Sequence, residues 1–269
     1  MAAHTHFHSD NSFSRPSVAG TRIIQITDPH IFASPEASLD GVNTADTLAQ
    51  VLSLMRKRYW PPAAVVLTGD LVENVSRAAY QNLRAQLLEL DDVPVYCLPG
   101  NHDDPELMRQ VMPRESIYLV DHALFGEWIV IFLSTYLPGN HGGHLDQTAL
   151  NSLERLLHHP QAEYALVCLH HPVVPIGSPW LDAMGLDNPE ELFAVLDRQP
   201  KVKGVIWGHI HQEFSLYRKG VALLGTPSTC VQFLPGSDRF AKDPKGPGYR
   251  WLTLGADGRL QSGIVRVPV

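Results

Sequence analysis

The sequence predicts an α/β fold in which two packed β-sheets are flanked by helices. Short apolar runs rich in β-branched residues recur along the chain, helical patterns separate the early runs, and strand patterns alone follow residue 200. Alternation of strands and helices is typical of βαβ units, whose parallel strands are covered by helices. Several runs are apolar on both faces, which is typical of buried strands.

The expected strands are short and rich in Val, Ile and Leu. They cover residues 22–27, 63–68, 94–98, 128–133, 165–169, 204–207, 221–224, 250–254 and 263–267.

The first expected helix, residues 44–60, has the clearest signals. Asn43 or Thr44 can cap its start, and Pro61 and Pro62 end it. Its apolar residues recur at the spacing of one helix face: Leu48, Val51, Leu52 and Met55. Further helices are expected at residues 76–90, 146–159 and 189–197.

Residues 1–20 are expected to form a flexible tail and residues 21–269 a single domain. The tail is rich in polar residues, Pro and Gly and has no apolar run, so His4, His6 and His8 are given no part in the chemistry. The whole chain has 44% hydrophobic and 18% charged residues, as an ordinary globular protein does.

Charge and composition argue against several kinds of partner. A net charge of −7 does not favour nucleic acid, whose binding proteins carry a clustered basic face. No run approaches the roughly 18 apolar residues of a membrane span, and the N-terminus has no signal peptide pattern. Cys97, Cys168 and Cys230 are typical of reduced core cysteines, so we expect a cytoplasmic protein. A homodimer is an open alternative.

Residues that can bind metal follow five of the expected strands directly. Ligands bind at the carboxyl ends of strands in an open α/β sheet, so five such ends can converge on one crevice. Each segment alone is more often a turn, but together they contain only carboxylate, amide and imidazole, which bind borderline divalent metals. The segments are Asp28-Pro29-His30, Gly69-Asp70, Gly100-Asn101-His102-Asp103, His170-His171 and Gly208-His209-Ile210-His211.

The number of candidate ligands predicts two divalent ions. Seven ligands are too many for one tetrahedral ion but suit two ions that share a carboxylate and keep open positions for water or substrate. Asp70 is the expected bridge. Iron, manganese and zinc all accept these ligand types. The predicted metal ligands are Asp28, His30, Asp70, Asn101, His170, His209 and His211.

In this order the five segments resemble the blocks D-x-H, G-D, G-N-H-D, H and G-H-x-H of the calcineurin-like metallophosphoesterases. The resemblance covers residues 22 to 267 and implies a four-layer αββα sandwich of two mixed sheets with a dinuclear site. It favours His170 as the ligand, with His171 as the alternative. It implies that Asp28, His30, Asp70 and His211 hold one metal, and that Asp70, Asn101, His170 and His209 hold the other.

Details of these segments narrow the resemblance. Residues 69–74 lack the Arg and Gly that follow in the protein phosphatases of this superfamily, and Asp103 replaces their Glu. Residues 169–182, 208–213 and 226–233 are instead similar to the bacterial 3′,5′-cyclic AMP phosphodiesterases of the Icc/CpdA type. His144 stands where a closer relative would carry an acidic residue, so the rim of the pocket is expected to differ.

The resemblance implies hydrolysis of 3′,5′-cyclic AMP to 5′-AMP by attack of a metal-bound hydroxide. Two ions against two carboxylates would leave a cationic site that attracts a phosphodiester. The alternative substrates are other small diesters, such as a 2′,3′-cyclic nucleotide or a glycerophosphodiester. A nuclease would require a basic groove. A binding module with a degenerate site would lack ligands, whereas all seven are present.

His102 adjoins Asn101 and has no metal of its own in this count. We predict that it donates to the phosphate or protonates the departing 3′ oxygen, and that Asp103 orients it. Asn101, His102 and His209 are expected to contact the substrate. Trp180 could stack on a purine, although packing is the commoner role of a tryptophan.

Overall fold

The computed structural model of the chain describes residues 20–90 and 93–268. The expected tail lies outside the described residues, except that Gly20 already begins the first strand, β1 (Gly20–Ile26). Within the described part of the chain, no helix has both the length and the apolar composition that crossing a bilayer requires.

Two mixed six-stranded sheets form the centre of the molecule. Their strand orders are β16-β15-β1-β4-β5-β6 and β11-β12-β10-β9-β8-β7. Each has four neighbouring parallel strands, extended by antiparallel strands at the edges. Besides β1, the first sheet contains β4 (Ala64–Thr68), β5 (Val95–Leu98), β6 (Ile117–Tyr118), β15 (Gly248–Gly255) and β16 (Leu260–Arg266). The second contains β7 (His122–Phe125), β8 (Trp128–Phe132), β9 (Tyr164–Cys168), β10 (Val202–Trp207), β11 (Phe214–Arg218) and β12 (Val221–Gly225).

The four helices expected from the sequence are present. The N-terminus of the first is capped by Asn43, whose side-chain oxygen accepts a hydrogen bond from the backbone N–H of Asp46. The described residues form α1 (Thr44–Arg58), α2 (Arg77–Leu88), α3 (Pro105–Val111), α4 (Gln147–Leu157), α5 (Pro179–Asp182) and α6 (Pro189–Leu196). Of these, α3 and α5 are short and were not expected.

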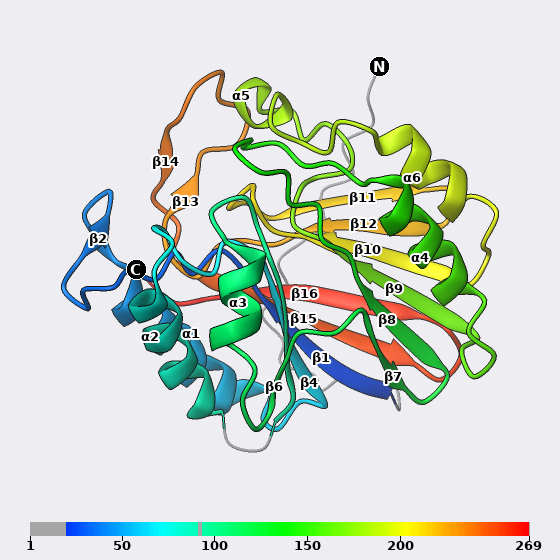
Figure 1. Cartoon of the computed structure of the whole chain (residues 1–269), viewed down its shortest axis with the longest axis horizontal. Helices are drawn as coiled ribbons and strands as arrows, with labels where there is room; N and C mark the ends of the chain where they lie inside the picture. The colour runs from blue at the N-terminus through cyan, green and yellow to red at the C-terminus, as the bar shows by residue number, and fades with distance from the viewer. Residues whose placement is uncertain (1–19, 91–92, 269) are drawn as a thin grey trace.

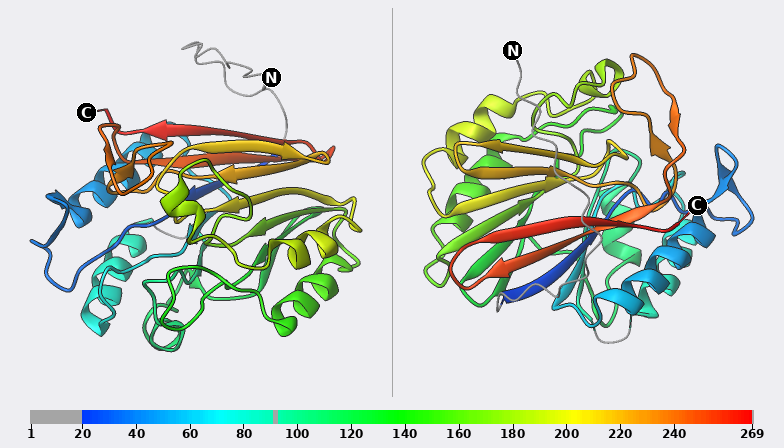
Figure 2. Two further views of the ribbon diagram at one scale, coloured as in Figure 1. Left: turned by 90° about the horizontal axis from the view of Figure 1, so that it is seen from above. Right: turned by 180° about the vertical axis from the view of Figure 1, so that it is seen from behind.

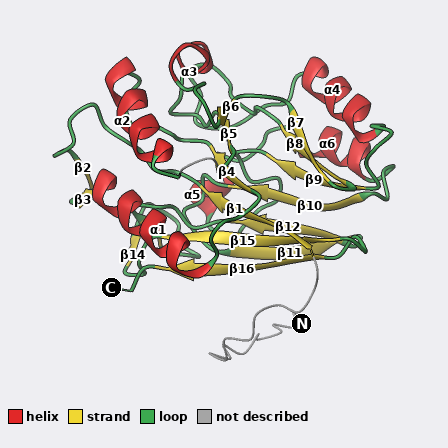
Figure 3. Cartoon of the chain, turned by 90° about the horizontal axis from the view of Figure 1, so that it is seen from below, coloured by secondary structure: helices red, strands yellow, loops and turns green. Residues whose placement is uncertain are grey.

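Alternate side chains of the central strands enter different cores, which gives the molecule four layers. In β1, Ile24 packs with the helices α1 to α3, whereas Ile23 lies between the two sheets. In β8, Ile129 packs with α4 and α6, whereas Val130 lies between the sheets. Figures 1 and 3 show α1 and α2 on one side of the sheets and α4 and α6 on the other. The αββα sandwich is therefore confirmed.

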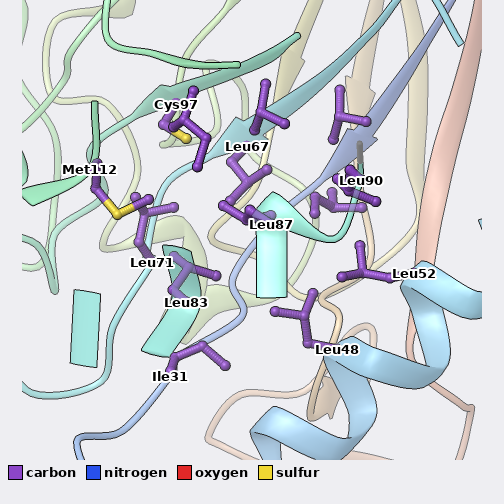
Figure 4. Close-up of a cluster of buried hydrophobic side chains, with 14 of the residues drawn as sticks. Ile31, Leu48, Leu52, Leu67, Leu71, Leu83, Leu87, Leu90, Cys97 and Met112 are labelled. Carbon is purple, nitrogen blue, oxygen red and sulfur yellow. The ribbon is translucent and has the colours of Figure 1, made fainter. Parts of the chain in front are cut away.

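The core between the first sheet and its helices extends to the predicted ligands. Figure 4 shows Leu48 of α1 and Leu83 of α2 near Leu67 of β4. Ile31, directly after His30, is buried in the same core. Packing of Ile31 therefore holds the backbone in place beside a candidate ligand.

A buried polar network joins the two sheets below the carboxyl ends of their strands. The side-chain amide of Gln25 donates to Thr68 Oγ1 at 2.8 Å and to the carbonyl of Trp207 at 3.0 Å. Thr226 Oγ1 donates to Gln25 Oε1, and Nε of the buried Arg250 donates to Thr226 Oγ1. These bonds satisfy groups that would be costly to bury alone, and they fix the sheets relative to each other.

Two short hairpins were also not expected: β2–β3 (Ser38–Leu39 and Val42–Asn43) and β13–β14 (Gln232–Phe233 and Lys242–Asp243). Strands of two residues are too short to show a periodic pattern. The first hairpin turns at Asp40-Gly41, where both residues have positive φ, as a two-residue hairpin turn requires. Both hairpins and α5 lie at one end of the molecule, in blue, orange and yellow-green in Figure 2.

Candidate metal centre

The ends of five strands bring the predicted ligands together. Asp28, Asp70 and Asn101 follow β1, β4 and β5 of the first sheet, and His170 and His209 follow β9 and β10 of the second. The two sheet edges meet here, as a hydrogen bond between them shows: the backbone N–H of His209 donates to the carboxylate of Asp28 at 3.0 Å. Six of the seven predicted ligands are buried, and Asn101 is half-buried.

One group of ligand atoms surrounds the side-chain oxygen of Asn101. His170 Nε2 and His209 Nδ1 lie 3.1 and 3.0 Å from this oxygen and 3.3 Å from each other. Asp70 Oδ1 lies 3.4 Å from His170 Nε2. Ligands bound to one ion at about 2.1 Å, with angles between 90° and tetrahedral, are about 3.0 to 3.4 Å apart. The atoms of this group therefore have the spacing of ligands around a single metal ion.

A second group lies on the other side of Asp70. His30 Nε2 is 3.2 Å from His211 Nε2 and 3.7 Å from Asp70 Oδ2, and His211 Nε2 is 3.5 Å from Asp28 Oδ1. Asp70 thus presents Oδ1 to the first group and Oδ2 to the second. The two groups contain the residues of the two sets that the resemblance implied, and combinations of these side chains could each hold an ion.

The backbone of the predicted ligands is strained. Among the described residues, eight non-glycine residues have positive φ, and five of them are predicted ligands with φ between 45° and 67°. Such conformations are uncommon and cost free energy, and they concentrate at functional sites. The five are Asp28, His30, Asp70, His209 and His211.

Two glycines of the sequence motifs are required because other side chains approach their Cα atoms too closely to leave room for a Cβ atom. A Cβ atom on Gly100 would collide with the carboxylate of Asp70. A Cβ atom on Gly208 would collide with the side chain of Thr27 and approach the carboxylate of Asp28. The glycines therefore allow the two sheet edges to come together around the ligands.

Backbone carbonyls orient two of the imidazoles. His170 Nδ1 lies 2.7 Å from the carbonyl oxygen of Thr68, and His211 Nδ1 lies 2.7 Å from that of Val231. Each Nδ1–H donates to its carbonyl, because a carbonyl can only accept. In the neutral ring Nε2 is then unprotonated and can bind a metal.

Glu73 orients the imidazole of His30 in the same way, and the sequence did not predict this role. Its Oε2 lies 2.8 Å from His30 Nδ1 and 3.5 Å from His102 Nδ1. Burial would raise the pKa of Glu73, but its hydrogen bond with His30 and the charges of both imidazoles lower it, so the carboxylate is ionised. The signal in the sequence was an acidic residue three positions after Asp70, but only the turn of this segment shows that it faces His30.

Ionisation in the absence of metal follows from burial and from the pairing of charges. Burial alone would raise the pKa of Asp70, but His170 and His30 hold it well below its usual range. Burial would lower the pKa of His170, but Asp70 and Asp28 raise it to about 9. Burial and the neighbouring His170 lower the pKa of His209 to about 3. His209 is therefore neutral at pH 7, while His170 carries a proton that a metal ion must displace.

His170 and His171 differ in where their ring nitrogens point. Nε2 of His170 belongs to the first group of ligand atoms. The ring of His171 has Nδ1 2.7 Å from Thr135 Oγ1 and Nε2 3.1 Å from the carbonyl oxygen of His141. Both nitrogens of His171 therefore have partners in the loop that follows β8.

Asp103 does not orient His102, so that expectation was wrong. The carboxylate of Asp103 accepts from two backbone N–H groups and from the hydroxyl of Tyr80 at 3.0 Å. Burial raises its pKa to about 7. His102 Nδ1 instead lies 3.2 Å from the carbonyl oxygen of Glu73. Asp103 braces the turn that carries Asn101.

A cavity of about 250 Å³ opens onto both groups of ligand atoms. Its inner part is lined by predicted ligands together with Glu73 and His102. Its outer part is lined by side chains from the two hairpins and α5. Five of these are called the outer wall below: Leu39, Asp40, Trp180, Phe233 and Phe240.

Trp180 packs against a neighbouring ring and also lines the cavity. Its ring lies 5.2 Å from that of Phe233, measured between centroids. His144 is paired with Asp187 at the surface, with Nδ1 2.8 Å from Oδ1. His141, three residues before it, is the residue of this loop that lines the cavity.

A known protein family matches most of the chain. The family described as calcineurin-like phosphoesterase matches residues 21–213, a range that contains all seven predicted ligands. The chain belongs to this family. The match ends at Glu213, before Phe233 and Phe240 of the outer wall.

Two bacterial proteins are similar to this chain over nearly its whole length. The chain is 40% identical over 250 residues to an Escherichia coli (strain K12) protein named 3′,5′-cyclic adenosine monophosphate phosphodiesterase CpdA, covering 93% of this chain and 90% of that one. It is 39% identical over 251 residues to the Pseudomonas aeruginosa protein of the same name, covering 93% and 91%.

Solved structures share the fold at low identity. A dimetal phosphatase from Danio rerio matches with a TM-score of 0.60 and 19% identity, covering 92% of this chain and 99% of that one. GAP50, described as the anchor in the inner membrane complex of Plasmodium, matches with a TM-score of 0.62 and 14% identity, covering 91% and 84%. At such identities the likeness concerns the fold alone.

Proposed function

We propose that this phosphoesterase hydrolyses 3′,5′-cyclic AMP to 5′-AMP at a site that holds two divalent ions. The position of Asp70, with one carboxylate oxygen toward each group of ligand atoms, supports the dinuclear site. The substrate class is supported by relatives of about 40% identity over more than nine tenths of the chain that are named as cyclic AMP phosphodiesterases.

The residues present fit two ions of iron, manganese or zinc. Asp28, His30, Asp70 and His211 would hold one, and Asp70, Asn101, His170 and His209 the other, through carboxylate, amide and neutral imidazole donors. When bound, the ions would supply Lewis-acid activation of the phosphoryl group and of the attacking water. Glu73 adds a negative charge that the sequence count omitted, so the excess of positive charge is smaller than predicted.

His102 would act on the substrate rather than on a metal. Its Nδ1–H donates to the carbonyl of Glu73, and the residue lines the cavity. In the metal-free protein, burial would lower its pKa, but Asp70 and Glu73 raise it above the ordinary value of histidine. His102 can then donate a proton to the departing 3′ oxygen. Asn101 and His209 line the same cavity and would contact the phosphate.

We infer that the protein acts in the cytoplasm on a free nucleotide. The cysteines Cys97, Cys168 and Cys230 are all buried and unpaired, which suits a reducing compartment. The 250 Å³ cavity is at the small end for ligand pockets, about 300 to 1,000 Å³, and suits one small molecule.

A substrate panel tests the proposal. The metal-reconstituted protein is assayed with 3′,5′-cyclic AMP, 2′,3′-cyclic AMP and glycerophosphocholine, and kcat/KM is compared. We expect the 3′,5′ ring to be preferred, with activity abolished by a chelator and restored by Mn²⁺. Preference for one of the other diesters would retain the metal site but reject the substrate, and activity that survives complete metal removal would reject the mechanism.

A further inference from the structure

The outer wall contains aromatic surface that the metal site does not explain. Phe240 lines the cavity, and 47% of its surface is exposed. Phe233 stacks on the ring of His211 with centroids 4.0 Å apart and an interplanar angle of 3°. Trp180 and Phe240 pack edgewise or tilted against Phe233, so the three rings form one continuous surface from a ligand to the cavity mouth.

The rest of the outer wall combines one apolar and one acidic residue. Leu39 and Asp40 come from the β2–β3 hairpin, and the positive φ of Asp40 and Gly41 fixes its tight turn. Nζ of Lys242, on β14, donates to the carbonyl of Asp40 at 2.9 Å and joins the tips of the two hairpins. This bond uses the backbone oxygen of Asp40 rather than its carboxylate, and Asp40 is an exposed residue that lines the cavity.

We propose that the outer wall is a subsite for the amino-bearing purine base of the cyclic nucleotide. One face of the base would lie against the continuous aromatic surface that Trp180 and Phe240 form, and the carboxylate of Asp40 would accept a hydrogen bond from its exocyclic amine. This inference rests on the proposed function, because it assumes that the phosphate lies at the metal ligands and the base extends toward the cavity mouth.

Physical chemistry favours this occupant over a lipid or sugar diester. A flat base uses aromatic surface, and stacking of one base on an aromatic side chain changes affinity by about 5- to 150-fold. An exocyclic amine matches the acceptor Asp40, whereas a glycerol head group presents no flat face to the rings. The residues lining the cavity, within the described part of the chain, include no lysine or arginine that would serve a second phosphate.

The experiment compares substrates that differ only in the base. The wild-type protein is assayed with 3′,5′-cyclic AMP, with 3′,5′-cyclic IMP, which replaces the amine by a carbonyl, and with the 3′,5′-cyclic phosphate of 1-O-methylribose, which has no base. We expect kcat/KM to fall in this order. Phe240→Ala should reduce the preference for cyclic AMP over the base-free ring about tenfold, mainly through KM, and Asp40→Asn should reduce the preference for cyclic AMP over cyclic IMP about fivefold.

Two variants serve as controls. Tyr217→Ala removes an exposed ring on β11, and Asp238→Asn removes an exposed carboxylate from the loop of the second hairpin. Neither should change any ratio, and hydrolysis of the base-free ring at the wild-type rate shows that each variant is folded. Equal kcat/KM for all three substrates in the wild type, or unchanged ratios in Phe240→Ala and Asp40→Asn, would overturn the subsite while leaving the proposed function intact. Failure to hydrolyse any 3′,5′ ring would overturn both.

Discussion

Five of the predicted metal ligands and the outer wall line the same cavity, but the two sets of residues are built in different ways. The ligands are buried at the ends of central strands, and most are held in strained backbone conformations by bonds to neighbouring segments. The wall residues are mostly half-buried or exposed and come from short hairpins and a one-turn helix. The comparison teaches that the chemistry depends on the rigid sheet edges, whereas the choice of substrate depends on loops that can vary without disturbing the core.

Asp70→Ala should have the largest effect, because it removes a side chain shared by both groups of predicted ligands. Asp70 offers one oxygen to each group of ligand atoms, so the variant should bind neither ion tightly and lose activity on every diester by at least about 10³-fold. Elemental analysis of the purified protein measures the metals. Asp40→Asn is the matched control and should keep two ions per chain. Two retained ions in Asp70→Ala would reject the bridging assignment.

His102→Ala should separate proton transfer from metal binding. We expect kcat to fall by about 10² to 10⁴ for 3′,5′-cyclic AMP, with the metal content unchanged, because general acid catalysis contributes that much. A diester with a p-nitrophenolate leaving group needs little protonation and should be affected far less. Wild-type turnover of cyclic AMP by this variant would remove His102 from the mechanism.

Glu73→Gln tests a group that orients a ligand without binding the metal. Because Glu73 Oε2 is 2.8 Å from His30 Nδ1, the amide should hold the ring less firmly and in a less basic state. Metal affinity or activity should fall by about 10- to 100-fold. Excess Mn²⁺ should restore part of the activity, whereas it should not rescue His102→Ala. Unchanged metal affinity and unchanged activity would show that His30 needs no such support.

The smallest expected effect is on the pH dependence of stability, and it tests the pairing of His170 with the carboxylates among the predicted ligands. The pKa of His170 is raised to about 9 in the metal-free protein, above its value of about 6.5 in the unfolded chain. The stabilisation from protonated His170 is therefore complete below pH 6.5 and is lost as pH rises through 9. The Tm of the metal-free protein should fall over this range, and His170→Asn should flatten the decline. An equal decline in both proteins would contradict the assignment.

Much of the fold could be predicted because the central strands have a strong local signal. Runs such as residues 63–67 and 128–133 are apolar throughout and can only be buried on both faces. The edge strand β11 was missed, because Leu216 and Tyr217, which point to opposite faces of the strand, are both exposed and give no regular alternation. The β2–β3 and β13–β14 hairpins are too short for periodicity, although Asp40-Gly41 is a turn signal that was available.

The sequence by itself determined which residue types stand at the strand ends, and hence the predicted ligands and their order along the chain. It could not determine that Glu73 rather than Asp103 lies beside His102, or that Phe240 and Asp40 share a cavity with His211. Strand-end positions follow from local periodicity, which a sequence records directly. Contacts between segments far apart in the sequence, such as the hydrogen bond from Lys242 to Asp40, depend on how the two sheets pack and where the loops turn, which only the tertiary structure decides.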